Sequence, residues 1–200
     1  ELLKLGANIN LWDQTQGMTP IMWAASEDHH ETVSMLTANG VEVDQSPKSG
    51  PKAGTTALMV SAALGNTQTV RMLLKLKANP NLQDQEGMTA LMRAAGGGYS
   101  PTVQLLLGEK ASVALKANNG CTALFCAAQR GNVEIAQLMI EAGAYVDEPL
   151  SQGITPLMCA AGNGHHEMVR ELVTLGADVL KEDKEGMTAL KHAAKNRQMN

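Results

Sequence analysis

Three glycines, Gly96, Gly97 and Gly98, end the stretch GMTALMRAAGGG, and a basic residue, Arg93, lies close by. A glycine run can bind phosphate where it precedes a helix, because free N–H groups and the helix dipole both favour an anion there. These glycines follow an apolar run instead, and the next helix is expected to begin at Ser100-Pro101. The stretch therefore predicts a helix end in which two positions carry no side chain, rather than a phosphate loop.

Histidines and cysteines are the other residues that could do chemistry. The pairs in His29-His30-Glu31 and His165-His166-Glu167 point about 100° apart on a helix, so they do not converge on a metal ion. Cys121, Cys126 and Cys159 are an odd set without the C-x-x-C spacing of a zinc site. We expect free thiols in a reducing compartment, no metal and no cofactor.

Composition narrows the classes of function further. The chain has neither a G-x-S-x-G motif nor a P-loop, so we do not expect an enzyme. The net charge is −4, and the basic residues form no run. Both observations argue against nucleic acid as a partner. No apolar stretch is long enough to predict membrane insertion. With only five aromatic residues and twelve methionines, the composition favours short, closely packed helices.

A repeated pattern runs through the whole chain. The motif G-x-T-[AP]-[LI] recurs at intervals of 37, 33, 33, 33 and 33 residues, beginning at Gly17, Gly54, Gly87, Gly120, Gly153 and Gly186. The threonine is of the type that caps a helix N-terminus, and Pro20 and Pro156 follow it where a missing N–H costs little. A second, leucine-rich run and a polar segment complete each copy. The pattern predicts helix–turn–helix units at a fixed period.

The clearest copy, GITPLMCAAGNGHHEMVRELVTLGADV at 153–179, resembles the repeats of the ankyrin family. The resemblance implies an all-α solenoid with hairpin-like fingers, in a single array over 1–200. Its expected units are 1–16, 17–53, 54–86, 87–119, 120–152, 153–185 and 186–200. Neither end resembles a polar capping repeat, so we expect a segment of a longer array or multidomain protein. The expected location is cytoplasmic, with the nucleus left open.

Two departures from the family pattern stand out. Lys77 and Lys110 occupy the helix-ending position where glycine is expected, and a left-handed backbone there would be strained. The finger from Gln45 to Gly54 has four extra residues and is rich in Pro, Gly, Ser and Lys. It is either a tolerated surface insertion or a partner contact, with Ser46 before Pro47 as a candidate phosphorylation site.

The resemblance also implies a binding surface, because family members bind partners on a concave face formed by first helices and fingers. Counting the fifth, eighth and ninth residues from each threonine, together with the first finger, gives the candidate set Trp12, Trp23, Glu27, Val60, Leu64, Arg93, Gly96, Gly97, Cys126, Arg130 and Asn163. An apolar end beside two arginines would suit an extended peptide or an acidic segment with a hydrophobic anchor. Alternatively, Trp23 only covers a neighbouring helix.

These features predict a protein–protein interaction scaffold. A second hypothesis is a regulatory nucleotide- or oligonucleotide-binding module of a larger channel or enzyme, in which Trp23, Arg93 and Arg130 would supply the contacts. A third is a structural spacer within a longer array.

Overall fold

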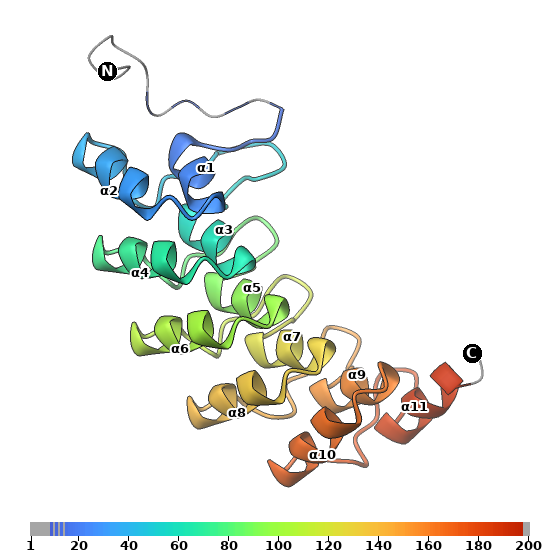
Figure 1. Ribbon diagram of the computed structural model, residues 1–200. Coiled ribbons are helices and arrows are strands. Elements are labelled where there is room, and N and C mark those ends of the chain that lie inside the picture. The colour runs from blue at the N-terminus through green and yellow to red at the C-terminus, as the bar shows by residue number, and fades with distance from the viewer. Residues whose placement is uncertain (1–8, 10, 12, 14, 198–200) are drawn as a thin grey trace.

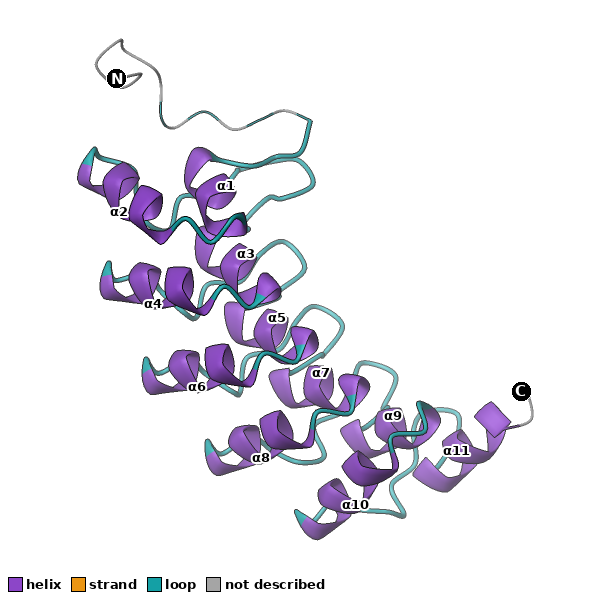
Figure 2. Ribbon diagram, viewed as in Figure 1, coloured by secondary structure: helices purple, strands orange, loops and turns teal. Residues whose placement is uncertain are grey.

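The computed structural model describes residues 9, 11, 13 and 15–197, with side chains as far as residue 195 (Figure 1). This part of the chain contains eleven helices and no strand (Figure 2). The helices are α1 (Pro20–Ser26), α2 (His30–Ala38), α3 (Ala57–Leu64), α4 (Thr67–Lys75), α5 (Ala90–Gly97), α6 (Ser100–Gly108), α7 (Ala123–Arg130), α8 (Val133–Glu141), α9 (Pro156–Gly162), α10 (His166–Thr174) and α11 (Ala189–Arg197). The all-α prediction is confirmed.

The threonine of each repeated motif begins a helix. From Thr19 to Thr155, each side chain accepts the backbone N–H three residues further on, at 3.2 to 3.4 Å. Pro20 and Pro156 occupy the first helical position, as expected. Each cap satisfies a backbone donor that has no partner within the helix. The repeated motif therefore fixes where each first helix starts.

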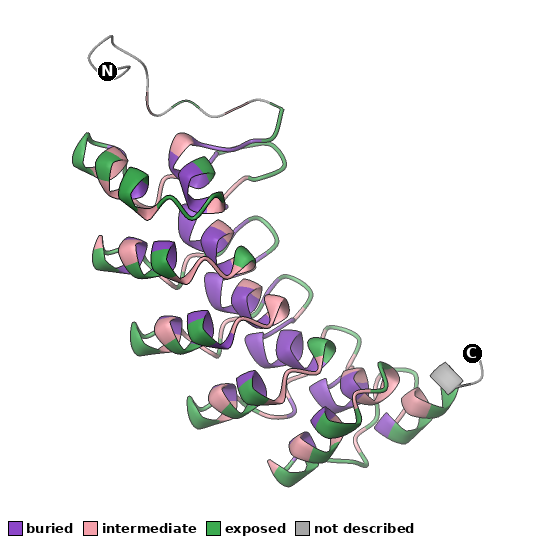
Figure 3. Cartoon of the chain, viewed as in Figure 1, coloured by how far each residue is buried: buried purple, intermediate pink, exposed green. Residues whose placement is uncertain are grey.

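The helices form two parallel rows (Figure 1). The odd-numbered helices contact one another in series from α1 to α11, and the even-numbered helices form a second row from α2 to α10. Colouring by burial shows that the odd-numbered row carries most of the buried surface (Figure 3). The division into repeats at the boundaries above stays a prediction, although each expected unit from 17 to 185 contains one helix of each row.

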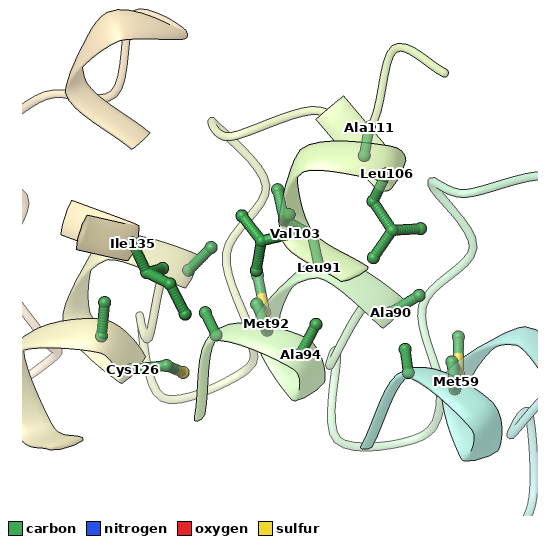
Figure 4. Close-up of a cluster of buried hydrophobic side chains, with 14 of the residues drawn as sticks. Met59, Ala90, Leu91, Met92, Ala94, Val103, Leu106, Ala111, Cys126 and Ile135 are labelled. Carbon is green, nitrogen blue, oxygen red and sulfur yellow. The ribbon is translucent and has the colours of Figure 1, made fainter. Parts of the chain in front are cut away.

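The core lies between the rows and between neighbouring repeats. The third residue of each first helix is large and almost fully buried from α1 to α9: Met22, Met59, Met92, Phe125 and Met158. Met92 lies close to Leu91 and Val103 in the middle of the array (Figure 4). Packing at this one repeated position therefore runs through the core from α1 to α9.

The fingers are tied together by backbone hydrogen bonds. Each of four fingers donates one N–H to the finger before it, at 2.9 to 3.2 Å: Gln85 to Ala53, Asn118 to Glu86, Ser151 to Asn119 and Lys184 to Gln152. The finger with the insertion closes on itself, since the N–H of Gly54 donates to the carbonyl of Pro47 at 2.9 Å. Its Pro51 carbonyl accepts from the side chain of Gln85 at 3.4 Å. The insertion is therefore packed against the next finger.

Candidate functional site

Three hollows follow one another along the odd-numbered helices, and we call this line the inner groove. The first has a volume of about 490 Å³ and lies over α1, α3 and α5. The second, of about 480 Å³, lies over α5 and α7, and the third, of about 360 Å³, over α7, α9 and α11. Ala63 and Arg93 line both the first and second hollows, and Gln129 lines both the second and third. Successive hollows of the inner groove are therefore adjacent to one another.

The first hollow contains most of the predicted apolar residues. Trp23, Val60 and Leu64 line it, with Glu27 at its edge. Trp23 is 40% exposed and Leu64 is 49% exposed, although both are apolar residues on short helices with buried opposite faces. Helical spacing places the fifth and ninth residues from each threonine on this face, and this is why the sequence could identify these side chains.

Arg93 is held by acidic residues of the finger that precedes α5. Its guanidinium donates to the carboxylate of Asp84 at 2.5 Å and lies 3.6 Å from Glu86. Asp84 is buried, and it also accepts the backbone N–H groups of Glu86 and Met88 at 2.9 Å. Asp84 thus fixes the finger turn and the arginine together. This ion pair weighs against an acidic partner segment at Arg93, because the guanidinium already has a carboxylate partner.

The second hollow is lined by Gly96, Cys126 and Arg130, all of which were predicted from the sequence. Nε of Arg130 donates to the carbonyl of Gly96 at 2.9 Å, so this arginine bridges two repeats. Asn163 lines the third hollow. Trp12 lies outside the described residues.

Gly97 differs from the other predicted residues. It lines none of the three hollows, and a Cβ built on it would lie 2.3 Å from Cε2 of Tyr99. The same ring would meet a Cβ on Gly65 at 2.4 Å. The prediction that Gly97 is a bare position in the binding face is therefore corrected: the ring of Tyr99 covers it.

The histidine and cysteine side chains do not gather into a metal site in the described part of the chain. Ring nitrogen Nε2 of His165 lies 2.9 Å from the carbonyl of Gln129, so this histidine ties one repeat to the next. Within the described residues, no cluster of three or more His, Cys, Asp or Glu could hold a metal ion. All three cysteines are free, and Cys121 lies next to Cys126, a proximity that the sequence reasoning did not anticipate.

Two further lining residues were also missed. Pro51 and Lys52 come from the inserted finger and form part of the wall of the first hollow. The only signal for them in the sequence is the 37-residue spacing. It indicates that the finger has extra residues, but not where in space these residues lie. The insertion thus distinguishes the first hollow from the other two.

Comparison with protein families agrees with this architecture. A model described as "Ankyrin repeats (3 copies)" matches residues 1–84, 62–149 and 145–200. The chain belongs to the ankyrin-repeat family. Repeats of this kind are generally protein–protein interaction modules and are typically non-catalytic. A search of curated proteins gave no significant match. No described helix has the length and apolar character that a membrane crossing requires.

Proposed function

We propose that this chain binds an extended segment of a partner protein along the inner groove, with a large apolar side chain of the partner seated in the first hollow. The observation that carries the proposal is the exposure of Trp23 and Leu64 to solvent in the same hollow. Covering such side chains removes apolar surface from water, and tryptophan is among the residue types most often found at binding hot spots.

The charges around the first hollow favour a basic residue beside the apolar anchor. Three carboxylates, those of Glu27, Asp84 and Glu86, line it together with two cations, Lys52 and Arg93. Asp84 neutralises Arg93, and the side chain of Glu86 is 68% exposed. The hollow therefore has an excess of negative charge, as does the chain as a whole at −4. A lysine or arginine of the partner would complement it.

The experiment selects peptides from a random library displayed on phage and measures their affinity by fluorescence polarisation. We expect the selected peptides to combine a large apolar residue with a neighbouring Lys or Arg. Trp23→Ala and Leu64→Ala should each weaken binding at least fivefold, equivalent to about 1 kcal/mol. Met35→Ala is the matched control, because Met35 is 61% exposed on α2, in the other row. The affinity of Met35→Ala for the selected peptides should stay within twofold of that of the wild type.

Equal binding by Trp23→Ala, Leu64→Ala and the wild type would place the site elsewhere. Failure to select any peptide would favour the spacer hypothesis. The nucleotide hypothesis is tested in the same preparation, by titrating ATP and short oligoadenylates while recording tryptophan fluorescence. The ion pair between Arg93 and Asp84 weighs against it, since the arginine that would meet a phosphate is already neutralised.

A further inference from the structure

The thiols of Cys121 and Cys126 lie side by side, with their Sγ atoms 3.2 Å apart. Cys121 comes just before the capping residue Thr122, and Cys126 is the fourth residue of α7. These two positions face each other at a capped helix start, where they usually hold a pair of apolar side chains. The corresponding pairs in the other repeats are Met18 and Trp23, Thr55 and Val60, Met88 and Arg93, Ile154 and Cys159, and Met187 and His192. Of these six pairs, only that of α7 consists of two thiols.

We infer that Cys121 and Cys126 form a site of reversible oxidation, at which a hydroperoxide such as hydrogen peroxide converts the two thiols into an intramolecular disulfide. A disulfide requires an Sγ–Sγ distance of about 2.05 Å, so the two sulfur atoms must approach by about a further 1.2 Å. Both side chains are already directed at each other by the helix start. Cys159 occupies the position in α9 that Cys126 occupies in α7, but its own facing residue is Ile154.

The hydrogen bond between the thiols gives them different roles. Cys126 as donor lowers the pKa of Cys121, because the bond stabilises the thiolate, although burial acts in the opposite direction. The same bond and burial raise the pKa of Cys126, which keeps its proton. Burial also raises the pKa of Cys159, to about 11. Since the thiolate is the nucleophile, Cys121 is the thiol that reacts first.

The oxidation proceeds in two balanced steps. The thiolate of Cys121 attacks one peroxide oxygen and the O–O bond breaks. The departing hydroxide takes up the proton that Cys121 released when it ionised, and leaves as water. Sγ of Cys126 then attacks the sulfenic sulfur of Cys121, expels its hydroxide and supplies the proton that makes a second water. Two electrons pass from the two sulfur atoms to one peroxide. Small thiols reverse the reaction by exchange.

The cysteine pair lies beside the second hollow. Cys126 lines the second hollow, which opens along the inner groove, and Cys121 is itself 8% exposed. Arg93 and Gly96 line the same hollow, and the missing side chain at Gly96 leaves room beside the thiol.

The test uses the position of tryptic cleavage sites. Lys116 and Arg130 enclose both thiols in one peptide, Ala117–Arg130, whereas Cys159 falls in another. The reduced chain is treated with stoichiometric hydrogen peroxide, alkylated, digested and analysed by mass spectrometry. We expect Ala117–Arg130 to appear unalkylated and about 2 Da lighter than the reduced, unalkylated peptide. After reduction with dithiothreitol, the same peptide should take up two alkyl groups. Cys159 should be alkylated in both samples.

Cys159→Ser should leave the mass change intact, and Cys121→Ser and Cys126→Ser should each abolish it. Circular dichroism checks that the variants are folded. The proposal is overturned if the peptide only gains oxygen atoms, if the disulfide joins either residue to Cys159, or if non-reducing electrophoresis shows that the disulfide links two copies of the chain.

Discussion

At the residue scale, Lys77 and Lys110 adopt a backbone conformation that favours glycine. Each lysine follows the C-cap residue of the second helix of its repeat, α4 or α6, and their φ angles are +69° and +63°. A side chain there brings Cβ close to the following carbonyl oxygen. The equivalent Gly40, Gly143 and Gly176 also have positive φ. The condition under which the sequence predicted strain at these two lysines is therefore met in the structure.

Lys77→Gly and Lys110→Gly should each stabilise the chain by about 1 kcal/mol, because glycine adopts this conformation without strain. Thermal and urea unfolding followed by circular dichroism measure the change.

The reciprocal variant Gly143→Lys is the matched control. A Cβ at Gly143 would meet no other atom within 4 Å, so the expected loss of about 1 kcal/mol comes from the backbone alone. Unchanged stability in all three variants would show that strain at these positions is negligible.

Sequence reasoning worked best for such local effects. The threonine caps and the left-handed lysines depend on a few consecutive residues. The repeat shows the corresponding positions in six copies, which makes them easy to compare. The pairing of Arg93 with Asp84 depends on a finger that folds back over nine residues. The contact between Cys121 and Cys126 joins the residue before the cap to the fourth helical residue, a pairing that helical spacing alone does not give. Helical register alone therefore predicts neither contact.

At the scale of elements, one aromatic ring sets how α5 ends and α6 begins. Tyr99, which precedes α6, packs against both Gly65 and Gly97. Asn66 and Asn132 occupy the same position in neighbouring repeats, and their side chains instead donate to carbonyl groups of the preceding repeat. The residues corresponding to Gly97 beside those asparagines are Leu64 and Arg130. The absence of a side chain at Gly97 thus leaves room for the ring of Tyr99, which is larger than the asparagine side chain of the neighbouring repeats.

Gly96→Ala and Gly97→Ala should therefore differ in sign. At Gly96 the nearest atom to a new Cβ would be Cβ of Cys126 at 3.8 Å, so alanine gains up to about 1 kcal/mol of helix propensity. At Gly97 the new Cβ would collide with the ring of Tyr99, and we expect a loss of about 1–3 kcal/mol. Urea unfolding measures both.

The double variant Gly97→Ala, Tyr99→Asn is the control, because asparagine removes the ring and restores the arrangement of the neighbouring repeats. It should recover most of the loss. If Gly97→Ala is as stable as Gly96→Ala, the ring moves aside without cost and does not determine the helix end.

At the scale of the whole molecule, the main contacts between the described helices lie within a repeat or between neighbouring repeats, so local changes should stay local. Asp183 provides a probe near the last described helix. The backbone N–H of Met187, the ring of His192 and the N–H of Glu185 hold its pKa below the ordinary 3.8. A lowered pKa in the folded state adds stability above pH 3.8, and this stability disappears as the pH falls through the folded pKa.

Asp183→Asn should lower the melting temperature at pH 7 and lower it less near pH 2.5, because the stability that the lowered pKa adds declines as the pH falls below 3.8. Hydrogen exchange at pH 7 should become faster in the finger 183–187 and in α11, and stay unchanged in α3 to α6. Asp44→Asn is the contrasting control, because burial raises the pKa of Asp44. It should not lower the melting temperature at pH 7. An equal loss for Asp183→Asn at both pH values would rule out the charge as its cause.

The fold as a whole followed from the sequence, because a fixed period requires each unit to bury its apolar face against the next. The candidate site followed only in part. Trp23, Val60 and Leu64 line the first hollow as expected, since their positions come directly from the helix register. The wall formed by Pro51 and Lys52 did not follow, because the path of an insertion depends on its contacts with the next finger.

Neighbouring fingers are joined by one backbone hydrogen bond and by a few side-chain contacts, such as Gln85 to Pro51 and Lys116 to Glu148, and this has a mechanical consequence. Each junction sets its own angle, and a small rotation at one junction is added to those of all the others beyond it. A partner that contacts both the first and the third hollow would therefore sense the sum of these rotations. The array would behave as a spring whose coils are loaded in series, and its curvature would be the quantity that bending or stretching changes first.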